Sequence, residues 1–431
     1  MPTDDSRIIR DPLWNTIRLS SIAVRIVDTP AFQRLRYIRQ LGFAHLVYPG
    51  ATHTRFDHAL GVYYLARTAL RILSDQDDLP EEVWVDRELV PYAALLHDIG
   101  HYAYSHALEE LEPENIPAGH EEVSARFFEA PELRAALLPL GPGATSRIHA
   151  MIQGRGAAPL RGLVSGSLDL DKMDYLRRDA RFCGVPYGEV DVDRLLQGLA
   201  LLQDPETGKW EVGVQEKAVA ALESLLFSRY QMFRNVYWHH AVRAATALYK
   251  RIVEEALREE LLDRDELVGP TDEELLYEIG RRAQADDVSE CAERIASRWI
   301  PALRHRRLPK RALEWTAADL DGVELAPWVR GDGPRKRRVE DRLARELGLE
   351  PGEVILDFPA RTGLFELDLL VRRRTGRIQR LSGRGLTGML DLPQVGNALS
   401  QTAKVLRVFT FERRELDADR VLALLAPDSP E

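Results

Sequence analysis

An aspartate inside an apolar run is the feature that most limits how this chain can fold. Asp98 follows His97 in "AALLHDIGH", where the other neighbours are apolar or small. Burying an ionised carboxylate in such a segment costs several kcal/mol unless a metal ion or a cationic side chain compensates the charge. We therefore expect Asp98 to lie against a cationic partner, and we treat the His-Asp pair as a candidate metal-binding pair.

Histidines gather around this segment. Of the 11 histidines, six fall between positions 53 and 120: His53, His58, His97, His101, His106 and His120. Imidazole is the commonest transition-metal ligand, and imidazole beside carboxylate suits divalent ions such as Mn, Fe, Zn or Mg. If a helix runs through the segment, His101 lies above His97 on the same face and brings a second imidazole near the ion. Isolated histidines such as His45, His149 and His305 are more simply explained as hydrogen-bonded core residues.

A second group of carboxylates follows about 70 residues later, in "GSLDLDKMDYLRRDA". It contains Asp169, Asp171, Asp174 and Asp179. Charged residues at such spacing are common on surface helices, so the stretch is weak evidence by itself. Its interest comes from the histidine cluster that precedes it.

Hydrophobic periodicity predicts a mainly helical fold. Apolar residues recur every three or four positions in "TPAFQRLRYIRQL", "HALGVYYLARTALRIL" and "ALESLLFSRYQMF", as in amphipathic helices. Beyond residue 260 the helical pattern continues in "DEELLYEIGRRAQA", and short β-branched and aromatic runs then appear in "EVILDFPARTGLFELDLLVRRR". We expect residues 1–260 to form a helical core with the active site, and residues 261–431 to form a helical extension and a smaller α+β lobe.

Composition narrows the class of protein. The chain of 431 residues is 45% hydrophobic, which is ordinary for a globular protein, and it contains no run of roughly 18–20 apolar residues that could span a membrane. Its start has no apolar signal region, so we expect a cytoplasmic protein. The two cysteines, Cys183 and Cys291, are far apart and indicate neither a disulfide framework nor a thiolate metal site.

The charge distribution leaves two interpretations open. A formal net charge of −10 argues against a protein that coats nucleic acid, because binding to the phosphate backbone favours a basic surface. Basic clusters nevertheless occur at residues 304–311, 335–338 and 372–380. Solvated charged faces explain most such runs, while an anionic ligand, a nucleic acid or a subunit contact is the alternative.

His58 in "HTRFDHALGV", His97 and Asp98 in "LLHDIGH", and Asp171 in "DLDKMDYLRRD" together form an H…HD…D pattern. This pattern resembles that of the HD phosphohydrolase superfamily, and the surrounding sequence over residues 7–245 is similar to the deoxynucleoside triphosphate triphosphohydrolases. The resemblance implies a helical HD core that holds one divalent metal ion per subunit, Mn, Fe, Mg or Zn, through these four residues. The animal member has a SAM domain before the HD core; here the chain begins almost at the HD region, so we expect no such domain.

The resemblance also assigns the substrate contacts. Arg55 matches an arginine on the α-phosphate, and three residues match groups that hold the phosphate chain: Lys172, Tyr175 and Arg229. Gln40 and Asp179 match the residues that hold the 3′-OH, with Leu41 beside them in the substrate-binding set. Tyr237 matches an aromatic residue packed beneath the ribose, where it leaves no room for a 2′-OH.

The catalytic histidines implied by the resemblance are His101, His106 and His120. Glu109 falls where the animal enzyme has a supporting aspartate, which is one carbon shorter. Attack at the α-phosphorus would expel the 5′-oxygen, with His106 as the acid and Glu109 orienting it. The products would be a deoxynucleoside and tripolyphosphate.

Two other functions remain open. One is an HD phosphohydrolase that acts on another nucleotide or phosphate ester. The other is a nucleotide-sensing or nucleic-acid-binding protein without turnover, which would use the basic clusters as its contact surface. The 3′-OH pair, Gln40 and Asp179, argues against the first alternative, and the complete set of metal ligands and catalytic histidines argues against the second.

A regulatory site is also implied. In the animal relative a guanine nucleotide binds at a subunit interface, and the residues that recognise it match Asp28, Gln33 and Arg36, with Arg7 on the phosphates. A carboxylate can accept from guanine N1–H and the 2-amino group, and arginine can donate to O6 and N7. Lys217 matches a second nucleotide site, in which an arginine is replaced by Gln215. We expect a homo-oligomer, a tetramer with a dimer as the alternative, activated by GTP or dGTP with Mg; the competing explanation is that Asp28 only caps a helix.

Overall fold

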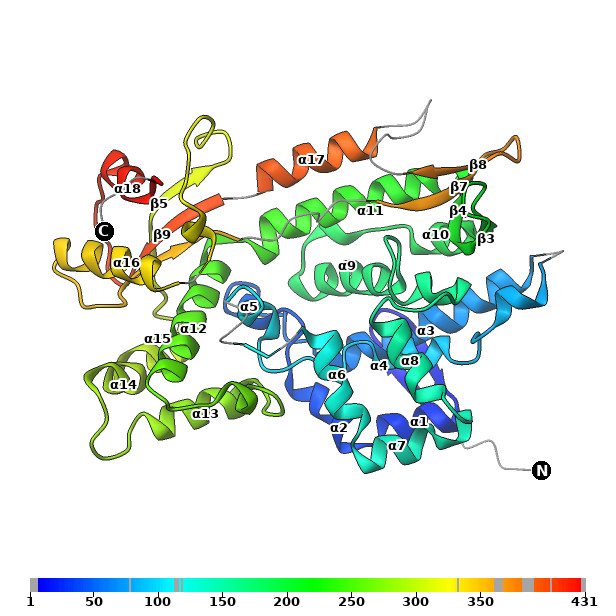
Figure 1. The fold of residues 1–431 in the computed structure, drawn as a ribbon, viewed down its shortest axis with the longest axis horizontal. Coiled ribbons are helices and arrows are strands. Elements are labelled where there is room, and N and C mark those ends of the chain that lie inside the picture. Colours follow the sequence, from blue (N-terminus) through cyan, green and yellow to red (C-terminus); the bar gives the residue numbers. More distant parts are fainter. Residues whose placement is uncertain are drawn as a thin grey trace.

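The structure is a computed structural model that describes residues 7–76, 79–111, 116–117, 119–331, 333–359, 367–381, 391–403 and 405–427. Within these ranges the chain is mainly helical with three small sheets (Figure 1), which confirms the predicted fold class. None of the helices in the described ranges combines the length and the apolar character that crossing a membrane requires.

The helices before residue 260 surround the predicted active-site residues. They are α1 (Ser21–Val27), α2 (Pro30–Gln33), α3 (Arg55–Ser74), α4 (Val90–Leu96), α5 (Ser105–Leu108), α6 (His120–Phe128), α7 (Pro131–Leu137), α8 (Ala144–Ile152), α9 (Leu170–Cys183), α10 (Val192–Gly198), α11 (Val219–Met232) and α12 (His240–Arg258). The later helices are α13 (Asp272–Arg282), α14 (Glu290–Arg294), α15 (Ile300–Arg304), α16 (Pro334–Glu346), α17 (Leu392–Ala403) and α18 (Ala418–Leu425).

The strands form three sheets. They are β1 (Arg7–Asp11), β2 (Asn15–Leu19), β3 (Leu199–Gln203), β4 (Trp210–Gln215), β5 (Lys310–Thr316), β6 (Val354–Asp357), β7 (Leu369–Arg372), β8 (Ile378–Leu381) and β9 (Val405–Thr410). The sheet orders are β1-β2, β3-β4-β7-β8 and β5-β9-β6. All pairs are antiparallel except β4 and β7, where Val214 faces Val371 in a parallel pair.

Two antiparallel hairpins, β1–β2 and β3–β4, lie in the region that we expected to be helical. β1 and β2 precede α1, and β3 and β4 separate α10 from α11. The C-terminal part of the chain contributes to both ends of the molecule, because β7 and β8 lie beside β3 and β4 while β5 and β9 lie at the opposite end (Figure 1).

α3 and α9 carry two predicted metal ligands, His58 and Asp171. α3 begins at a capping box in which Thr54 and Asp57 satisfy the first free amides, and most of its residues are buried. α9 begins where the Asp169 side chain accepts from the Lys172 N–H, and it ends at Gly184, whose φ of 68° suits glycine. Local capping therefore defines both helices that carry the site.

The predicted helix in "TPAFQRLRYIRQL" is wrong beyond its first turn. α2 ends at Gln33, a 3-10 turn covers residues 34–37, and the chain then pairs with the segment before α3. The Gln40 N–H donates to His53 O at 3.1 Å, and the Arg55 N–H donates to Ile38 O at 3.0 Å. These bonds between segments replace the bonds that a longer helix would make.

The helix that we expected through "LLHDIGH" also ends early. α4 stops at Leu96, so His97 and His101 do not lie on one helical face. Gly100 explains the compact turn that follows, because a Cβ atom there would lie 2.0 Å from His120 O at the start of α6. His101 nevertheless stays near the pair, since its Nε2 lies 3.1 Å from Asp98 Oδ1.

Two large apolar cores lie side by side. The first is built mainly from α1, α3, α4, α8, α9 and α11. The second surrounds α12 and includes residues of α13–α15, β6 and β9 together with Phe43 and Tyr104 from the first part of the chain. Residues on both sides of position 260 thus share one core; the division at that position stays a prediction.

Candidate active site

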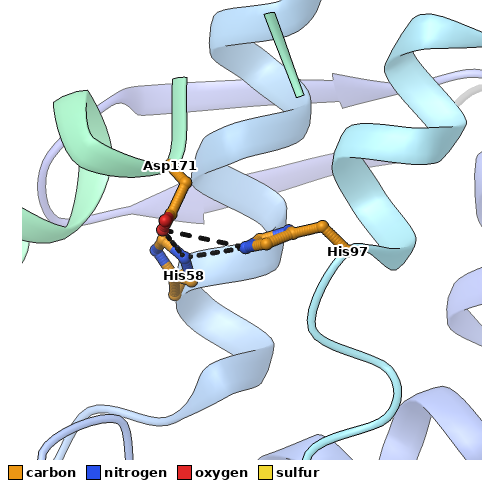
Figure 2. A group of neighbouring side chains, drawn as sticks. All are labelled: His58, His97 and Asp171. Atoms are coloured by element: carbon orange, nitrogen blue, oxygen red, sulfur yellow. Dashed lines mark hydrogen bonds and ion pairs between the residues drawn. The ribbon is translucent and has the colours of Figure 1, made fainter. Parts of the chain in front are cut away.

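Four predicted metal ligands converge from three segments. Figure 2 shows His58 from α3, His97 from the end of α4 and Asp171 from α9 pointing toward one another. His58 Nε2 lies 2.9 Å from Asp171 Oδ1 and 3.2 Å from His97 Nε2, and His97 Nε2 lies 3.8 Å from Asp171 Oδ1. Asp98 closes the group, with Oδ1 3.3 Å from His97 Nε2 and Oδ2 3.9 Å from His58 Nε2.

This geometry fits a divalent ion. With metal–donor distances of about 2.0–2.2 Å, adjacent donors are separated by roughly 3.0 Å in octahedral and roughly 3.5 Å in tetrahedral coordination. The tautomers fit as well, because His58 Nδ1 lies 2.8 Å from Asp174 Oδ2 and His97 Nδ1 lies 2.8 Å from Ala94 O. Both acceptors place the proton on Nδ1, so each Nε2 presents a lone pair to the centre of the cluster.

The electrostatics of the cluster favour a cation. Burial opposes the charged form of His58, but hydrogen bonds to Asp171 and Asp174 raise the pKa of His58 to about 10. The surrounding carboxylates thus favour a positive charge at this position, which a divalent ion can supply.

Asp98 has the cationic partner that its apolar surroundings require. Arg55 donates to Asp98 Oδ2 at 2.8 Å, and both side chains are almost fully buried. Burial disfavours ionisation, yet the nearby His97 and Arg55 hold the pKa of Asp98 well below its usual range. Asp98 therefore links the cluster of predicted metal ligands to Arg55 and, through its other oxygen, to His101.

The three predicted catalytic histidines lie together beyond Asp98. The ring of His101 stacks on that of His120 with centroids 3.7 Å apart, and the ring of His106 lies 4.9 Å from that of His101. Glu109 binds two of them, with its oxygens 3.1 Å from His106 Nδ1 and 3.0 Å from His120 Nδ1. Burial opposes its charge, but the neighbouring histidines lower the pKa of Glu109, which therefore stays an acceptor.

A pocket of about 380 Å³ joins these groups to the predicted substrate residues. Of the predicted catalytic, substrate and metal residues, those lining it are Gln40, Leu41, Arg55, His97, Asp98, His101, His106, His120, Asp171, Lys172, Tyr175, Asp179, Arg229 and Tyr237. His58 and Glu109 do not line the wall; they contact residues that do. The pocket thus brings together sites spread over about 200 residues.

The residues predicted to hold the sugar form a buried polar group. Both oxygens of Asp179 are engaged, one 2.8 Å from His53 Nε2 and the other accepting from Tyr237 OH at 2.7 Å. Gln40 Oε1 is buried on the pocket wall without a hydrogen-bond partner among the described residues. A buried acceptor of this kind is costly unless a ligand donates to it.

The residues predicted to hold the phosphates include three cations. Lys172 Nζ donates to Gly166 O at 3.0 Å and pairs with Asp169 at 2.5 Å, and the pocket also receives the side chains of Arg55 and Arg229. Burial opposes the charge on Lys172, but the adjacent Asp169 raises its pKa, so Lys172 stays a cation. Tyr175 lies among these groups.

The predicted regulatory residues fall into two places. Arg7 on β1 pairs with Asp28 at 2.9 Å, and both side chains are at least half exposed. Nearby, Gln33 donates to Val27 O at 2.7 Å and accepts from Arg36 at 2.8 Å. Lys217 is exposed on a turn before α11 and makes none of these contacts.

Several residues of the basic clusters at 304–311, 335–338 and 372–380 form ion pairs with acidic residues of the same chain. Arg380 binds Asp204, Glu211 and Asp368, and Arg311 pairs with Glu314 at 2.9 Å. These pairs are consistent with solvated or self-paired faces at these positions.

Sequence reasoning left three contributors to the site without a role. They are Asp174, which faces His58, His53, which faces Asp179, and Ser105, whose Oγ lies 2.5 Å from His101 Nδ1. Asp174 follows Asp171 by three positions, a spacing that places both on neighbouring parts of a helix surface. His53 belongs to the histidine cluster but its sequence context indicated no role, and Ser105 offered no signal.

Comparison with known proteins places this chain in a family. Residues 55–176 match the HD domain, and residues 190–384 match the HD associated region. The chain is 31% identical over 344 residues to the uncharacterized protein MJ1154 of Methanocaldococcus jannaschii. The aligned region covers 79% of this chain and 67% of that protein. It is 30% identical over 270 residues to the deoxynucleoside triphosphate triphosphohydrolase SAMHD1 of Homo sapiens, covering 55% of this chain and 42% of that protein.

Solved structures share the fold. A phosphohydrolase from Bacteroides thetaiotaomicron matches with a TM-score of 0.71 at 22% identity, over 94% of this chain and 100% of that one. A hypothetical protein from Aquifex aeolicus matches with a TM-score of 0.69 at 26% identity, over 94% and 96% of the two chains. The chain spans about two thirds of the archaeal relative and less than half of the human one. With its HD domain, its HD associated region and its H…HD…D residues, the chain belongs to the HD phosphohydrolase superfamily.

Proposed function

We propose that this protein hydrolyses deoxynucleoside triphosphates to a deoxynucleoside and tripolyphosphate. One observation carries the proposal: one pocket is lined by imidazole and carboxylate donors, by the cations Arg55, Lys172 and Arg229, and by the Gln40 acceptor, which has no partner among the described residues. The cations can neutralise the charge of a triphosphate, and a sugar hydroxyl can donate to the Gln40 acceptor. The resemblance to a deoxynucleoside triphosphate triphosphohydrolase supports the same substrate class.

His58, His97, Asp98 and Asp171 would hold the metal ion. When bound, a divalent ion at this position supplies Lewis-acid polarisation of a phosphate oxygen and lowers the pKa of water. Arg55, Lys172 and Arg229 neutralise the triphosphate, whose charge spreads over the equatorial oxygens in the transition state. The side chain of Arg55 also keeps Asp98 in place through their 2.8 Å contact.

His106 is our candidate for the acid that protonates the leaving 5′-oxygen. Its Nδ1 lies 3.1 Å from Glu109, and its side chain is 45% exposed, so it can reach a bound substrate. Glu109 orients the ring and stabilises its protonated form, as a carboxylate beside a catalytic imidazole does. His101 and His120 pack against each other beside it and complete the wall of the pocket.

Asp179, Tyr237 and Gln40 would select the sugar. Gln40 Oε1 can accept from the 3′-OH, while Tyr237 OH is fixed on Asp179 and holds its ring against the pocket. We propose that this ring excludes a 2′-OH. A misfitted or unpaired hydroxyl can lower kcat/KM by about 100-fold or more.

A substrate panel tests this function. The purified protein is incubated with Mn²⁺ or Mg²⁺ and with dGTP, dATP, dTTP, GTP, a nucleoside monophosphate or a generic phosphate ester. We expect tripolyphosphate from the deoxynucleotides and much lower kcat/KM for GTP. Release of orthophosphate from the monophosphate or the generic ester would favour another phosphohydrolase activity, and absence of any turnover would refute the proposal.

We also propose that GTP or dGTP, with Mg, activates a homo-oligomer at the site formed by Arg7, Asp28, Gln33 and Arg36. The exposed Asp28 carboxylate and Arg36 guanidinium have the acceptor and donor pattern that guanine requires. The expected result is faster hydrolysis of dATP or dTTP when GTP is added, with a shift to tetramers in sedimentation. Full activity without guanine nucleotide, with an unchanged sedimentation profile, would contradict this part and leave the catalytic proposal standing.

A further inference from the structure

Asp272, on the first turn of α13, is buried although it does not cap its own helix. It is 1% exposed, although it lies at a helix start where carboxylates are usually solvated. The free amides of this helix start are already served by a capping box, in which Thr271 binds the third residue and Glu274 binds back to Thr271. The Asp272 carboxylate is therefore available for other contacts.

The carboxylate reaches two backbone amides in two separate chain segments that both line the pocket. Oδ2 accepts from the Arg39 N–H at 2.9 Å, and Oδ1 accepts from the Tyr104 N–H at 3.3 Å. Arg39 immediately precedes Gln40 and Leu41, and Tyr104 immediately precedes Ser105 and His106. Asp272 lies 233 positions after Arg39 and 168 after Tyr104, so these contacts depend on tertiary packing.

Tyr104 needs such support. Its φ of 48° and ψ of 34° lie in the left-handed region, which is unusual for a residue with a large side chain. This conformation lets α5 begin at Ser105, so that Ser105 meets His101 and His106 meets Glu109. The Tyr104 ring is held by stacking on Phe43, with centroids 4.1 Å apart. Its amide is held by Asp272.

We propose that Asp272 is a positioning residue that joins α13 to the active site and holds the Gln40 and His106 segments in their catalytic arrangement. This inference rests on the proposed function, because it assumes that those two segments bind and protonate the substrate. It gives the helical extension after residue 260 a part in catalysis, although α13 contributes no residue to the pocket wall among the described residues.

The ionisation of Asp272 should make its two backbone contacts, and with them the activity, depend on pH. Burial raises the pKa of Asp272 to about 6, and the Arg39 and Tyr104 amides and the Arg39 charge oppose this rise. The other ionisable groups that act on this region are Glu273 beside it, Arg34 and Arg55 from the core, and the phenols of Tyr104 and Tyr249. As the pH falls below about 6, one carboxylate oxygen becomes a hydroxyl, and one amide loses its acceptor.

Fold stability changes in the opposite direction. Because the pKa is raised in the folded protein, the folded state binds this proton more tightly than the unfolded chain does. The contribution of Asp272 to stability is therefore full below the unfolded pKa and falls as pH rises toward 6. Protonation of Asp272 in mild acid should thus lower the activity without destabilising the fold.

The test compares Asp272→Asn with Glu273→Gln in the full chain. Asn is isosteric but presents an N–H₂ group to one of the two backbone donors, whereas Glu273 is exposed and pairs with the Arg39 side chain at 3.3 Å. For Asp272→Asn we expect a kcat about 10- to 100-fold lower, an unchanged metal content, and loss of the acidic limb near pH 6. Amide hydrogen exchange should accelerate in peptides covering residues 38–44 and 101–108 but not in α9. Glu273→Gln should match the wild type.

The outcomes separate the two proposals. Equal kcat, pH profile and amide exchange in Asp272→Asn and the wild type would overturn the positioning role while the proposed hydrolysis stands. If the wild type hydrolyses no deoxynucleotide, the proposed function fails, and the exchange comparison alone decides whether Asp272 holds the two segments. Should Asp272→Asn not fold, Asp272→Ser, which keeps a small acceptor, is measured by the same exchange experiment.

Discussion

At the scale of single residues, Asp174 explains how His58 is presented to the centre of the site. Asp174 is fully buried and faces His58 Nδ1 at 2.8 Å. Its carboxylate also accepts from Trp14 Nε1 at 2.5 Å and from Arg178, which in turn binds Asp11 at 2.8 Å. The β1–β2 hairpin is thereby connected to a predicted metal ligand. Acceptors behind metal-binding histidines fix the ring and raise its basicity.

Two variants should differ in their metal binding. We expect His97→Ala to lose metal occupancy and turnover while the fold stays helical, since it removes a direct donor. Asp174→Asn should weaken metal affinity about 10- to 100-fold, because Asn cannot accept from all its neighbours at once. Equilibrium dialysis with elemental analysis measures both, with the exposed Asp193→Asn as control. A full metal complement in His97→Ala would show that the ligand assignment is wrong.

At the scale of secondary-structure elements, the close approach of α3 and α9 creates the site. Gly61 lies one turn after His58, and a Cβ atom there would lie 2.0 Å from Asp174 Oδ1 and 2.5 Å from Arg178 Nη2. The absence of a side chain at Gly61 lets the two helices pack with the buried Asp174–Arg178 pair between them. Glycine inside a helix costs about 0.5–1 kcal/mol relative to alanine, and here the packing compensates for that cost.

Gly61→Ala should therefore destabilise the protein although alanine is the better helix former. We expect the overpacking to cost roughly 1–3 kcal/mol, lower the Tm and weaken metal binding through Asp174. Gly280→Ala on α13 is the matched control, because among the described residues its added Cβ would meet only Ile300 Cδ1, at 3.4 Å. Calorimetry compares the two. A Tm for Gly61→Ala equal to or above that of the wild type would contradict the close-packing explanation.

At the scale of the whole molecule, a buried ion cluster connects the C-terminal sheet to the segment that carries the predicted catalytic residues. Arg243 on α12 makes two 2.8 Å bonds to Glu110, and it binds Asp357 on β6 at 2.8 and 2.5 Å. Lys250 also binds Glu110, at 3.1 Å. Glu110 is the neighbour of Glu109 and lines the pocket with Arg243. Through Arg243, the C-terminal sheet thus contacts the residue that follows Glu109 in the histidine cluster.

Removing one partner of this cluster should be costly. We expect Asp357→Ala to destabilise the fold by roughly 3–5 kcal/mol, because it leaves a buried arginine incompletely paired. The control is Glu346→Ala, which breaks the exposed pair with Arg420 and should cost no more than about 1 kcal/mol. Thermal unfolding distinguishes the variants. Equal Tm shifts for Asp357→Ala and Glu346→Ala would argue against a supporting role for the C-terminal sheet.

The sequence was sufficient for those features that local patterns determine. The periodicity in residues 58–73, 221–233 and 272–285 predicted helices where α3, α11 and α13 lie, because a helix that buries one face repeats its apolar residues at its own pitch. The H…HD…D residues predicted the superfamily, and the carboxylate in an apolar run predicted a cationic partner, which proved to include Arg55. Solvation cost and helical pitch act over a few residues, so both are readable from a short stretch.

Only the tertiary structure decided which distant groups meet. The helix expected in residues 29–41 ends early because His53 and Arg55 bond its backbone, and the helix expected through His97 ends where Gly100 meets α6. Asp272 contacts Arg39 and Tyr104, and Asp174 contacts Trp14, across 160 or more positions. A buried carboxylate takes whichever donors the packing leaves unpaired, and the local sequence around it carries no information about those donors.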